Sequence, residues 1–287
     1  MPTETALIAA TAVSSVIAIG ALGRLLKLRA KQRCRAVFGS WPIPTVPITE
    51  AHSVFREDPS TNQRLSPKAG LPPTSAATFI PSEVAGVGVH GGTSNLEAFV
   101  LASLAAQSRT IFEFGTCTGR TTWLLARNAA QSLPAGSSPE PKVHTLTLPP
   151  EAHASYRVST KDSVTDTKRA LEESAYTSFY YTDTPEQPRI NQLFCDSKCF
   201  DERPYIVNGQ GTCDMIFIDG SHAASYVASD SEKALKMLAP GGIILWHDYR
   251  GRFRAPGVFT TLNSLRKRLD LKHIDGTSLV IYQKPVG

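Results

Sequence analysis

Cysteine is scarce in this chain, and no two cysteines have the CxxC spacing that typically holds zinc. Of the five cysteines, Cys195 and Cys199 are four residues apart and could meet. An odd number in a chain with 41% hydrophobic residues is more simply explained by reduced thiols that pack as small buried side chains. The sequence therefore predicts an apolar core without a zinc site or a disulfide framework.

Excess positive charge is missing from most of the chain, although the formal net charge is +5 at pH 7. Six Lys and Arg residues lie between positions 24 and 35, and +5 minus these 6 leaves −1 for all other residues. A domain that binds nucleic acid usually carries a basic face. Because the main part of this chain is close to neutral, we expect no nucleic-acid partner.

Charged side chains are absent from residues 5–23, TALIAATAVSSVIAIGALG. These nineteen residues would span about 28 Å as a helix, close to the thickness of a bilayer core. The basic residues that follow indicate a cytoplasmic C-terminal side by the positive-inside rule. A cleaved signal peptide, which usually starts with basic residues, and a packed N-terminal helix are the alternatives. We therefore expect residues 1–35 to be a single-pass membrane anchor with its basic flank.

Regular hydrophobic periodicity is also lacking in residues 36–81, which are rich in Pro, Ser and Thr. Repeated prolines disfavour both a helix and a central strand. We expect a partly extended linker here. A folded domain then occupies residues 82–287.

Within this domain, apolar strands alternate with amphipathic helices, which is the pattern of a parallel α/β sheet. Strands are predicted at 110–114, 142–148, 190–195, 214–218, 243–247, 271–275 and 278–283. Helices are predicted at 93–107, 121–131, 223–239 and 256–269. The last two strands are joined by Asp-Gly-Thr, a hairpin turn that makes the final strand antiparallel. The expected fold is a Rossmann-like, doubly wound sheet of seven strands.

Residues 149–189 show no clear period and carry several tyrosines among many polar residues. An insertion of this size in a compact domain is usually functional or disordered. A lid over a substrate and a surface excursion that packs on the domain are both open interpretations.

The stretch 111–126, IFEFGTCTGRTTWLLA, is typical of a strand, a glycine loop and a helix that begins near Thr121. Gly115 and Gly119 allow a tight turn and close approach of the backbone to a ligand. The free N–H groups at the start of the helix can face that ligand. Many nucleotide-binding folds share this arrangement, but the spacing lacks the GxGxxG of nicotinamide-dependent oxidoreductases, which we therefore disfavour.

Acidic residues stand at the carboxyl ends of four predicted parallel strands: Glu113, Asp196, Asp219 and Asp248. These strand ends share one edge of the sheet, where open α/β sheets bind their ligands. One such acid could be a helix cap or a turn residue. Four of them beside a glycine loop suit a polar ligand with hydroxyls, an amine and a cationic centre.

Five segments together resemble class I S-adenosylmethionine-dependent methyltransferases. They are EFGTCTGRTT (113–122), TLTLPP (145–150), CDS (195–197), FIDGSHAASYVASD (217–230) and LAPGGIILWHDY (238–249). The resemblance covers residues 93–283 in order and includes the antiparallel last strand. It implies methyl transfer from S-adenosylmethionine, with O-methylation of a small molecule or saccharide as the expected reaction.

The resemblance also implies a set of cofactor-binding residues: Glu113, Gly115, Thr116, Gly119, Thr121, Asp196, Ser197 and Asp219. The glycine loop would lie beneath the methionine part of the cofactor, with Glu113 holding the loop or the amino group. Asp196 and Ser197 would lie by the adenine. Asp219 would sit near the methionine end and the substrate, and His222 would line the same pocket.

One position departs from the family pattern. The acid that usually ends the second strand and binds the ribose hydroxyls is replaced by Thr147. The loss of a charge-assisted hydrogen-bond pair costs about 1.5–3 kcal/mol. Glu151 could substitute for it. Otherwise the chain could be a non-catalytic, membrane-tethered binding or assembly subunit with the same fold, which is the alternative function.

Two chemistries are open for the reaction itself. His222 or His247 could deprotonate the acceptor, together with Asp219. Because side chains alternate along a strand, His247 should point away from Asp248, which favours His222 as the base. Alternatively, Asp219 and Asp248 could bind Mg²⁺, which would lower the pKa of an acceptor hydroxyl. In some methyltransferases of this class an Asn or Asp completes that site, but Tyr249 follows Asp248 here.

Overall fold

The computed structural model describes residues 43, 45–46, 83–84, 87–88, 93–130, 140–156, 158–160 and 162–286. The chain divides into two compact units, residues 1–44 and 45–287, and the following description concerns the second. The predicted membrane anchor at 1–35 and almost all of the predicted linker lie outside the described residues. Within the described part, no helix combines the length and the apolar character that crossing a membrane requires.

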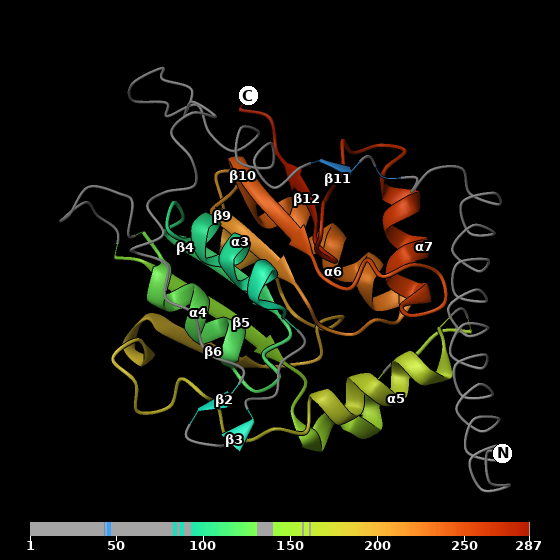
Figure 1. Ribbon diagram of the computed structural model, residues 1–287, viewed down its shortest axis with the longest axis horizontal. Helices are drawn as coiled ribbons and strands as arrows, with labels where there is room; N and C mark the ends of the chain where they lie inside the picture. Colours follow the sequence, from blue (N-terminus) through green and yellow to red (C-terminus); the bar gives the residue numbers. More distant parts are fainter. Residues whose placement is uncertain are drawn as a thin grey trace, which may run out of the picture. The chain divides into compact units, whose positions relative to one another are not determined.

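An eight-stranded sheet forms the centre of the domain (Figure 1). In spatial order its strands are β1 (Thr45–Val46), β11 (Lys272–Ile274), β12 (Val280–Gln283), β10 (Leu238–Trp246), β9 (Cys213–Ile218), β4 (Thr110–Phe114), β5 (Lys142–Thr147) and β6 (Ile190–Phe194). Two small ribbons pair β2 (Glu83–Val84) with β3 (Val87–Gly88) and β7 (Ile206–Val207) with β8 (Gln210–Gly211). The seven predicted strands are confirmed, and β1 adds an eighth, which pairs parallel to β11.

Strands β10, β9, β4, β5 and β6 are parallel, whereas β12 is antiparallel to both of its neighbours. After the edge strand β1, the chain enters the centre of the sheet at β4, continues outward through β5 and β6, and then returns to β9 on the other side of β4. The order therefore reverses between β4 and β9. Such a switch point, at the carboxyl ends of the strands, is where open α/β sheets bind ligands.

Helices cover both faces of the sheet. On one face, α3 (Asn95–Ala105) packs beside α4 (Arg120–Asn128) over a core that includes Ile111, Met215 and Leu245. On the other face lies α6 (Ala224–Met237), with α7 (Pro256–Leu265) beside it. The Trp246 indole donates to Ser231 of α6 at 2.9 Å, which ties this helix to β10.

The helix starts agree with simple capping rules. Ser94 caps α3 in a reciprocal pair with Glu97, in which each side chain bonds the other residue's backbone N–H. Pro256 occupies the first turn of α7, where its missing N–H costs nothing. By contrast, α6 ends at Met237, two residues before its predicted end at 239, and Pro240-Gly241-Gly242 lies inside β10 at a register shift.

The segment 149–189 is more ordered than its sequence pattern indicated. It contains α5 (Val164–Glu173) and two short 3-10 helices, η2 (Pro150–Ser155) and η3 (Gln187–Arg189); a third, η4 (Arg203–Tyr205), follows β6. Ser163 caps α5, and the pairs Lys168–Glu172 and Arg169–Glu173 support it at i,i+4 spacing. These local signals were present in the sequence, but the helix has few apolar residues, so it lacks an amphipathic pattern.

The second face of β4 is held by an aromatic cluster. The ring of Phe112, which is fully buried, lies 4.8 Å from Phe114, 5.1 Å from Phe200 and 5.0 Å from Tyr205 between centroids. Removing a large side chain from such close packing lowers the stability of the fold.

We expect Phe112→Ala to lower the free energy of unfolding by about 3–5 kcal/mol, because it leaves a cavity in this cluster. Urea unfolding of the full chain, followed by tryptophan fluorescence, measures the change. Phe253→Ala serves as the control, because Phe253 is 79% exposed and its removal should change stability by less than about 0.5 kcal/mol. Equal losses in the two variants would contradict the assigned packing.

Candidate functional site

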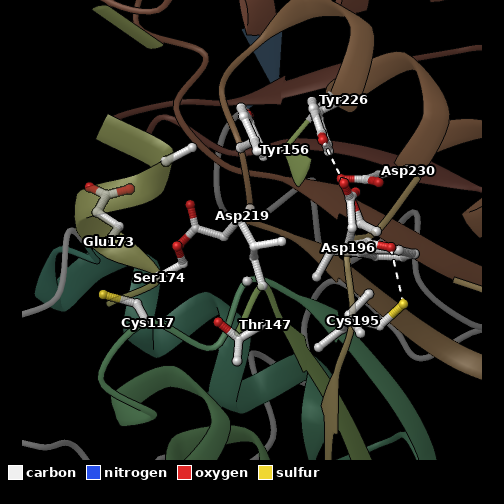
Figure 2. Close-up of a pocket in the computed structure, with 18 residues that line it drawn as sticks. Cys117, Thr147, Tyr156, Glu173, Ser174, Cys195, Asp196, Asp219, Tyr226 and Asp230 are labelled. Atoms are coloured by element: carbon white, nitrogen blue, oxygen red, sulfur yellow. Dashed lines mark hydrogen bonds between the residues drawn. The ribbon is translucent and has the colours of Figure 1, made fainter. Parts of the chain in front are cut away.

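A cavity that opens to solvent lies at the carboxyl ends of β4, β5, β6 and β9, at the switch point of the sheet. The residues at and after the ends of these strands form its floor, and Tyr156 with residues of α5 and α6 forms its walls. Its lining includes Gly115, Cys117, Thr147, Tyr156, Glu173, Ser174, Asp196, Ser197, Asp219, Tyr226 and Asp230. Figure 2 shows Asp219 near the middle of this set, with Glu173 and Asp196 on opposite sides of it in the view.

The glycine loop after β4 is fixed against β9. Gly115 has φ of +102°, and a Cβ atom there would lie 2.3 Å from the carbonyl oxygen of Asp219. Glycine is therefore required for this close approach of two backbones. The N–H of Asp219 donates to the carbonyl of Phe114 at 2.9 Å, so the loop and the acid hold each other in place.

Glu113 lies beneath the loop and outside the lining of the cavity. Its Oε2 accepts hydrogen bonds from Thr122 at 2.5 Å and from Thr145 at 2.7 Å, and Thr145 also contacts the Thr116 hydroxyl at 2.8 Å. Glu113 is fully buried, and burial raises its pKa from the usual 4.5 to about 8. This geometry fits a role in holding the loop, which is one of the two roles predicted for Glu113.

Three other predicted cofactor ligands support the loop from outside the cavity. Thr116 accepts from the side chain of Gln192 at 3.1 Å, and Gly119 begins α4 with φ of +75°. The hydroxyl of Thr121 lies 3.2 Å from that of Thr93. The cavity itself is lined by Gly115 and by the residues after β6 and β9.

At the end of β6, Asp196 is 7% exposed and both of its oxygens are bonded. The backbone N–H of Lys198 donates to Oδ1 and the hydroxyl of Tyr226 to Oδ2, each at 2.9 Å. The Tyr226 ring is stacked on Tyr156, with centroids 4.4 Å apart, and the Lys198 ammonium lies 3.9 Å from its centroid. Because Tyr156 and Lys198 pack against the Tyr226 ring, the Tyr226 hydroxyl is held in its hydrogen bond to Asp196.

The segment between β5 and β6 supplies cavity residues that the sequence analysis missed. Glu173, at the end of α5, and Ser174 line the cavity near Cys117. Ser174 also lies 2.9 Å from the Nε2 atom of His153, and Glu173 is paired with Arg169 at 2.7 Å. Part of the segment 149–189 therefore lines the cavity and adds a carboxylate to it.

Thr147 lines the cavity at the end of β5, as its place in the sequence predicts. The suggestion that Glu151 replaces the acid missing there is wrong, because Glu151 is exposed on η2 and outside the lining.

Four other carboxyl groups line the cavity: Glu173, Asp196, Asp219 and Asp230. No Lys, Arg or His is among the described residues of that lining, so the walls favour a ligand with positive charge.

Behind Asp219 lies a buried network of acids and histidines. The Nδ1 atom of His247 is 2.9 Å from Oδ1 of Asp219, and its Nε2 atom is 3.4 Å from Glu97. Asp248 is paired with Nε2 of His222 at 2.7 Å and with Nε of Arg250 at 2.8 Å. Three carboxylates thus face three groups that can carry positive charge.

The electrostatics of this network follow from its pairing. Burial opposes a charged imidazole, but the carboxylates around it, Asp219 first, hold the pKa of His247 well above its usual value. Burial likewise opposes ionised Asp248 and Glu97, yet their pKa values lie well below the usual range, chiefly through His222 and His247 respectively. His247 is therefore a charged partner of the acids near neutral pH, and against the effect of burial Asp248 raises the pKa of His222 as well.

Two predictions about the histidines need correction. Strand alternation placed His247 away from Asp248, but β10 ends at Trp246 and Asp248 has φ of +61°, so both side chains turn toward Asp219. His222 was predicted to line the cofactor pocket. It instead lines a smaller cavity of about 220 Å³ behind Asp219, and its Nε2 atom is engaged by Asp248.

A divalent cation does not fit this arrangement well. Donor atoms of Asp219, His247 and Asp248 lie within 4.8 Å of one another, close enough to share an ion. However, one oxygen of Asp219 and both of Asp248 already face His247, His222 or Arg250. An ion would have to displace positively charged partners, so the predicted Mg²⁺ enters none of the steps described below.

Residues 112–249, just under half of the chain, match the family model described as a methyltransferase domain. The match begins in β4 and ends directly after Asp248, so it contains the glycine loop and all four acids predicted at strand ends. A comparison with curated proteins gave no match.

Solved structures show a distant likeness. One is an O-methyltransferase from Streptomyces achromogenes, involved in tomaymycin synthesis and in complex with SAM; it is 18% identical, with a TM-score of 0.45, over 68% of this chain and 81% of that one. Another is an O-methyltransferase from Bacillus cereus in complex with SAH, 17% identical with a TM-score of 0.41 over 66% and 80% of the two chains. At these values we assign no residue role from either structure.

The buried carboxyl of Glu113 predicts a pH dependence of stability. Its folded pKa of about 8 lies above the unfolded 4.5, so the folded state holds the extra proton between these values. Stability should therefore fall as pH rises across that window, by on the order of 1.4 kcal/mol for each pH unit.

Glu113→Gln should remove this slope, because the amide keeps an oxygen for the threonine hydroxyls and does not ionise. Urea unfolding at pH 5, 6, 7 and 8 compares the variant with the unchanged chain. Glu172→Gln is the control, since the side chain of Glu172 is 64% exposed. If the Glu113→Gln variant keeps the full slope, the protonated state assigned to Glu113 is wrong.

Proposed function

We propose that residues 93–286 form a class I methyltransferase domain, which transfers the methyl group of S-adenosylmethionine to a hydroxyl of a small molecule or saccharide. The sheet order, with a reversed β12 between β10 and β11, is that of the class. The observation that carries the proposal is the cavity at the switch point, which has a glycine loop as its floor and four carboxyl groups in its walls.

The charge of the cavity suits this cofactor. S-adenosylmethionine carries a sulfonium and an ammonium group, and acidic walls without a lining Lys, Arg or His among the described residues stabilise both. Gly115 lines the cavity at the loop, and Asp196 with Ser197 stands at the end of β6 where the family resemblance places the adenine. Asp219 would then face the reacting methyl group.

Bound S-adenosylmethionine supplies an electrophilic methyl carbon and a leaving sulfide. The protein's part is to align an acceptor hydroxyl and to remove its proton. Asp219 is suited to this, because His247 holds Oδ1 at 2.9 Å while the side chain, 20% exposed, reaches the cavity. Asp219 would take up the proton that the acceptor hydroxyl gives up when it receives the methyl group.

The non-catalytic alternative draws its support from Thr147, which offers no charge to the ribose hydroxyls. The four carboxyl groups around the cavity weaken that argument, since they provide electrostatic attraction from other positions. Binding without turnover would nevertheless favour the alternative, so the test below separates the two functions.

We further propose that residues 5–23 anchor the domain in a membrane, with the domain on the cytoplasmic side. This rests on the sequence: nineteen residues without a charge followed by six basic residues within positions 24–35.

The cofactor proposal predicts that the full chain binds S-adenosylhomocysteine with micromolar affinity in calorimetry. Asp219→Asn should lower S-adenosylhomocysteine release with a panel of phenols, catechols and saccharides by about 10²–10⁴-fold, with binding changed less than tenfold. Asp270→Asn, with a side chain 80% exposed, is the matched control for both measurements. A folded chain that does not bind S-adenosylhomocysteine would end the proposal.

The anchor proposal predicts that the full chain stays in the membrane fraction after an alkaline carbonate wash. Replacing Ile17 and Ile19 together by Asp should move most of it to the soluble fraction, since each charge at the centre of a span costs about 2.5–3.5 kcal/mol. Thr3→Asp, outside the apolar run, should leave the partition unchanged. Recovery of the unchanged chain in the soluble fraction would refute the anchor.

A further inference from the structure

The positive charge of the domain is concentrated around α7. Residues 250–272 contain seven Lys and Arg residues and one acid, which gives this segment a net charge of +6. The chain outside positions 24–35 has a net charge of −1, so subtracting this +6 leaves −7 for all remaining residues. A domain that is acidic elsewhere thus carries one strongly basic segment, which the proposed methyl transfer leaves unexplained.

Six residues of this segment form two exposed clusters, one at each end of α7. Arg252, Phe253 and Arg254 lie in the loop before the helix, and residues 266–268, Arg-Lys-Arg, follow its last residue. The ten residues of α7 separate the two clusters by about 15 Å. Because α7 packs beside α6 (Figure 1), both clusters belong to the folded domain. We call residues 252–254 and 266–268 together the α7 surface.

Few acids neutralise the α7 surface. Arg268 lies 3.8 Å from Glu232, but both side chains are more than half exposed, and such a pair contributes little. Within the described part of the chain, no acid forms an ion pair with Arg254, Arg266 or Lys267. The α7 surface therefore keeps a positive charge that complements an anionic partner.

Two exposed apolar side chains indicate the kind of anionic partner. Phe253 is 79% exposed between its two arginines. The side chain of Asp166 accepts from the backbone of Gly257, which brings the start of α5 to the start of α7. There Val164 adds a second apolar side chain, which is 86% exposed. Cationic and apolar side chains side by side are typical of segments that lie in the interface of a membrane.

We propose that the α7 surface docks on a membrane that contains anionic lipids, with Phe253 entering the boundary between headgroups and acyl chains. The arginines and the lysine attract the headgroups, and the acyl chains bury the phenyl ring. Single-stranded RNA also binds arginines and aromatic rings, but an aliphatic side chain such as Val164 offers it no stacking. The docking requires neither the methyl transfer nor the anchor proposed above.

The test uses the full chain with Ile17→Asp and Ile19→Asp, which removes the contribution of residues 5–23. Co-sedimentation measures its binding to vesicles of phosphatidylcholine and phosphatidylserine in equal parts, with pure phosphatidylcholine as the reference. Arg252→Gln with Arg254→Gln should weaken binding to the mixed vesicles by about 20–30-fold, because each arginine near an anionic surface contributes a factor of about five.

Arg203→Gln with Lys236→Gln is the matched control. Both side chains are more than half exposed, but each is paired with an acid at 2.7 Å, so their loss should change vesicle binding by less than about twofold.

A second measurement reports on position 253 itself, because the basic residues at 24–35 also attract anionic lipids. In the same background, Phe253→Trp should add a tryptophan signal that shifts to the blue on mixed vesicles and is quenched by brominated acyl chains. Phe194→Trp, at a position 56% exposed on the edge strand β6, should show neither effect.

Equal vesicle binding by the Arg252→Gln, Arg254→Gln chain and by the control would overturn the proposal. An unshifted tryptophan at 253 on vesicles that the chain binds would do the same. Binding of single-stranded RNA that these two arginines support, without vesicle binding, would assign the surface to nucleic acid instead. Arg266→Gln with Lys267→Gln is the second variant should the first not fold, with a similar expected loss. None of these results depends on S-adenosylhomocysteine binding, so the proposed function is tested separately.

Discussion

The close approach of two backbones at the switch point is the constraint on which the rest of the site depends. Gly115 lies so near Asp219 that a Cβ atom would stand 2.3 Å from its carbonyl oxygen, and the Asp219 N–H bonds to Phe114. This contact joins the first strand of the chain's path through the sheet to the strand that it reaches after winding outward and back. The glycine loop and the central acid thus cannot move independently, and any ligand in the cavity meets both in fixed positions.

The acids around this contact fall into two classes. Asp248 and Glu97 are paired with histidines or Arg250, and such pairing keeps a buried carboxylate charged at neutral pH. Glu113 and Asp230 are as deeply buried, but their direct bonds go to hydroxyl groups, so their pKa values rise to about 8 and about 7. The same edge of the sheet therefore carries acids that stay ionised at neutral pH and acids whose charge changes with pH near neutrality.

The sequence predicted the edge of the sheet at which the cavity lies, because a run of apolar residues followed by an acid marks the end of each parallel strand. Parallel strands bring these ends together, and the glycine loop follows the first of them, β4. The sequence could not predict the backbone conformation after a strand end. Asp248 follows the strand with φ of +61°, and His247 therefore points in the direction opposite to the expected one. Sequence reasoning also missed α5, whose capping and ion pairs were visible but whose apolar period was not, and hence Glu173.

Asp230 and Thr147 show which properties depend on contacts between distant segments. The sequence neighbours of Asp230 do not show that the residue is buried or that its Oδ1 atom has no hydrogen-bond partner among the described residues, because this depends on how α6 packs in the domain. Thr147 by itself offers no charge, but four carboxyl groups line the same cavity. Electrostatic attraction to a ligand with positively charged groups depends on the sum of these charges rather than on a single residue. For the proposed cofactor, the missing acid would remove a contact to the ribose, while the acidic character of the cavity remains.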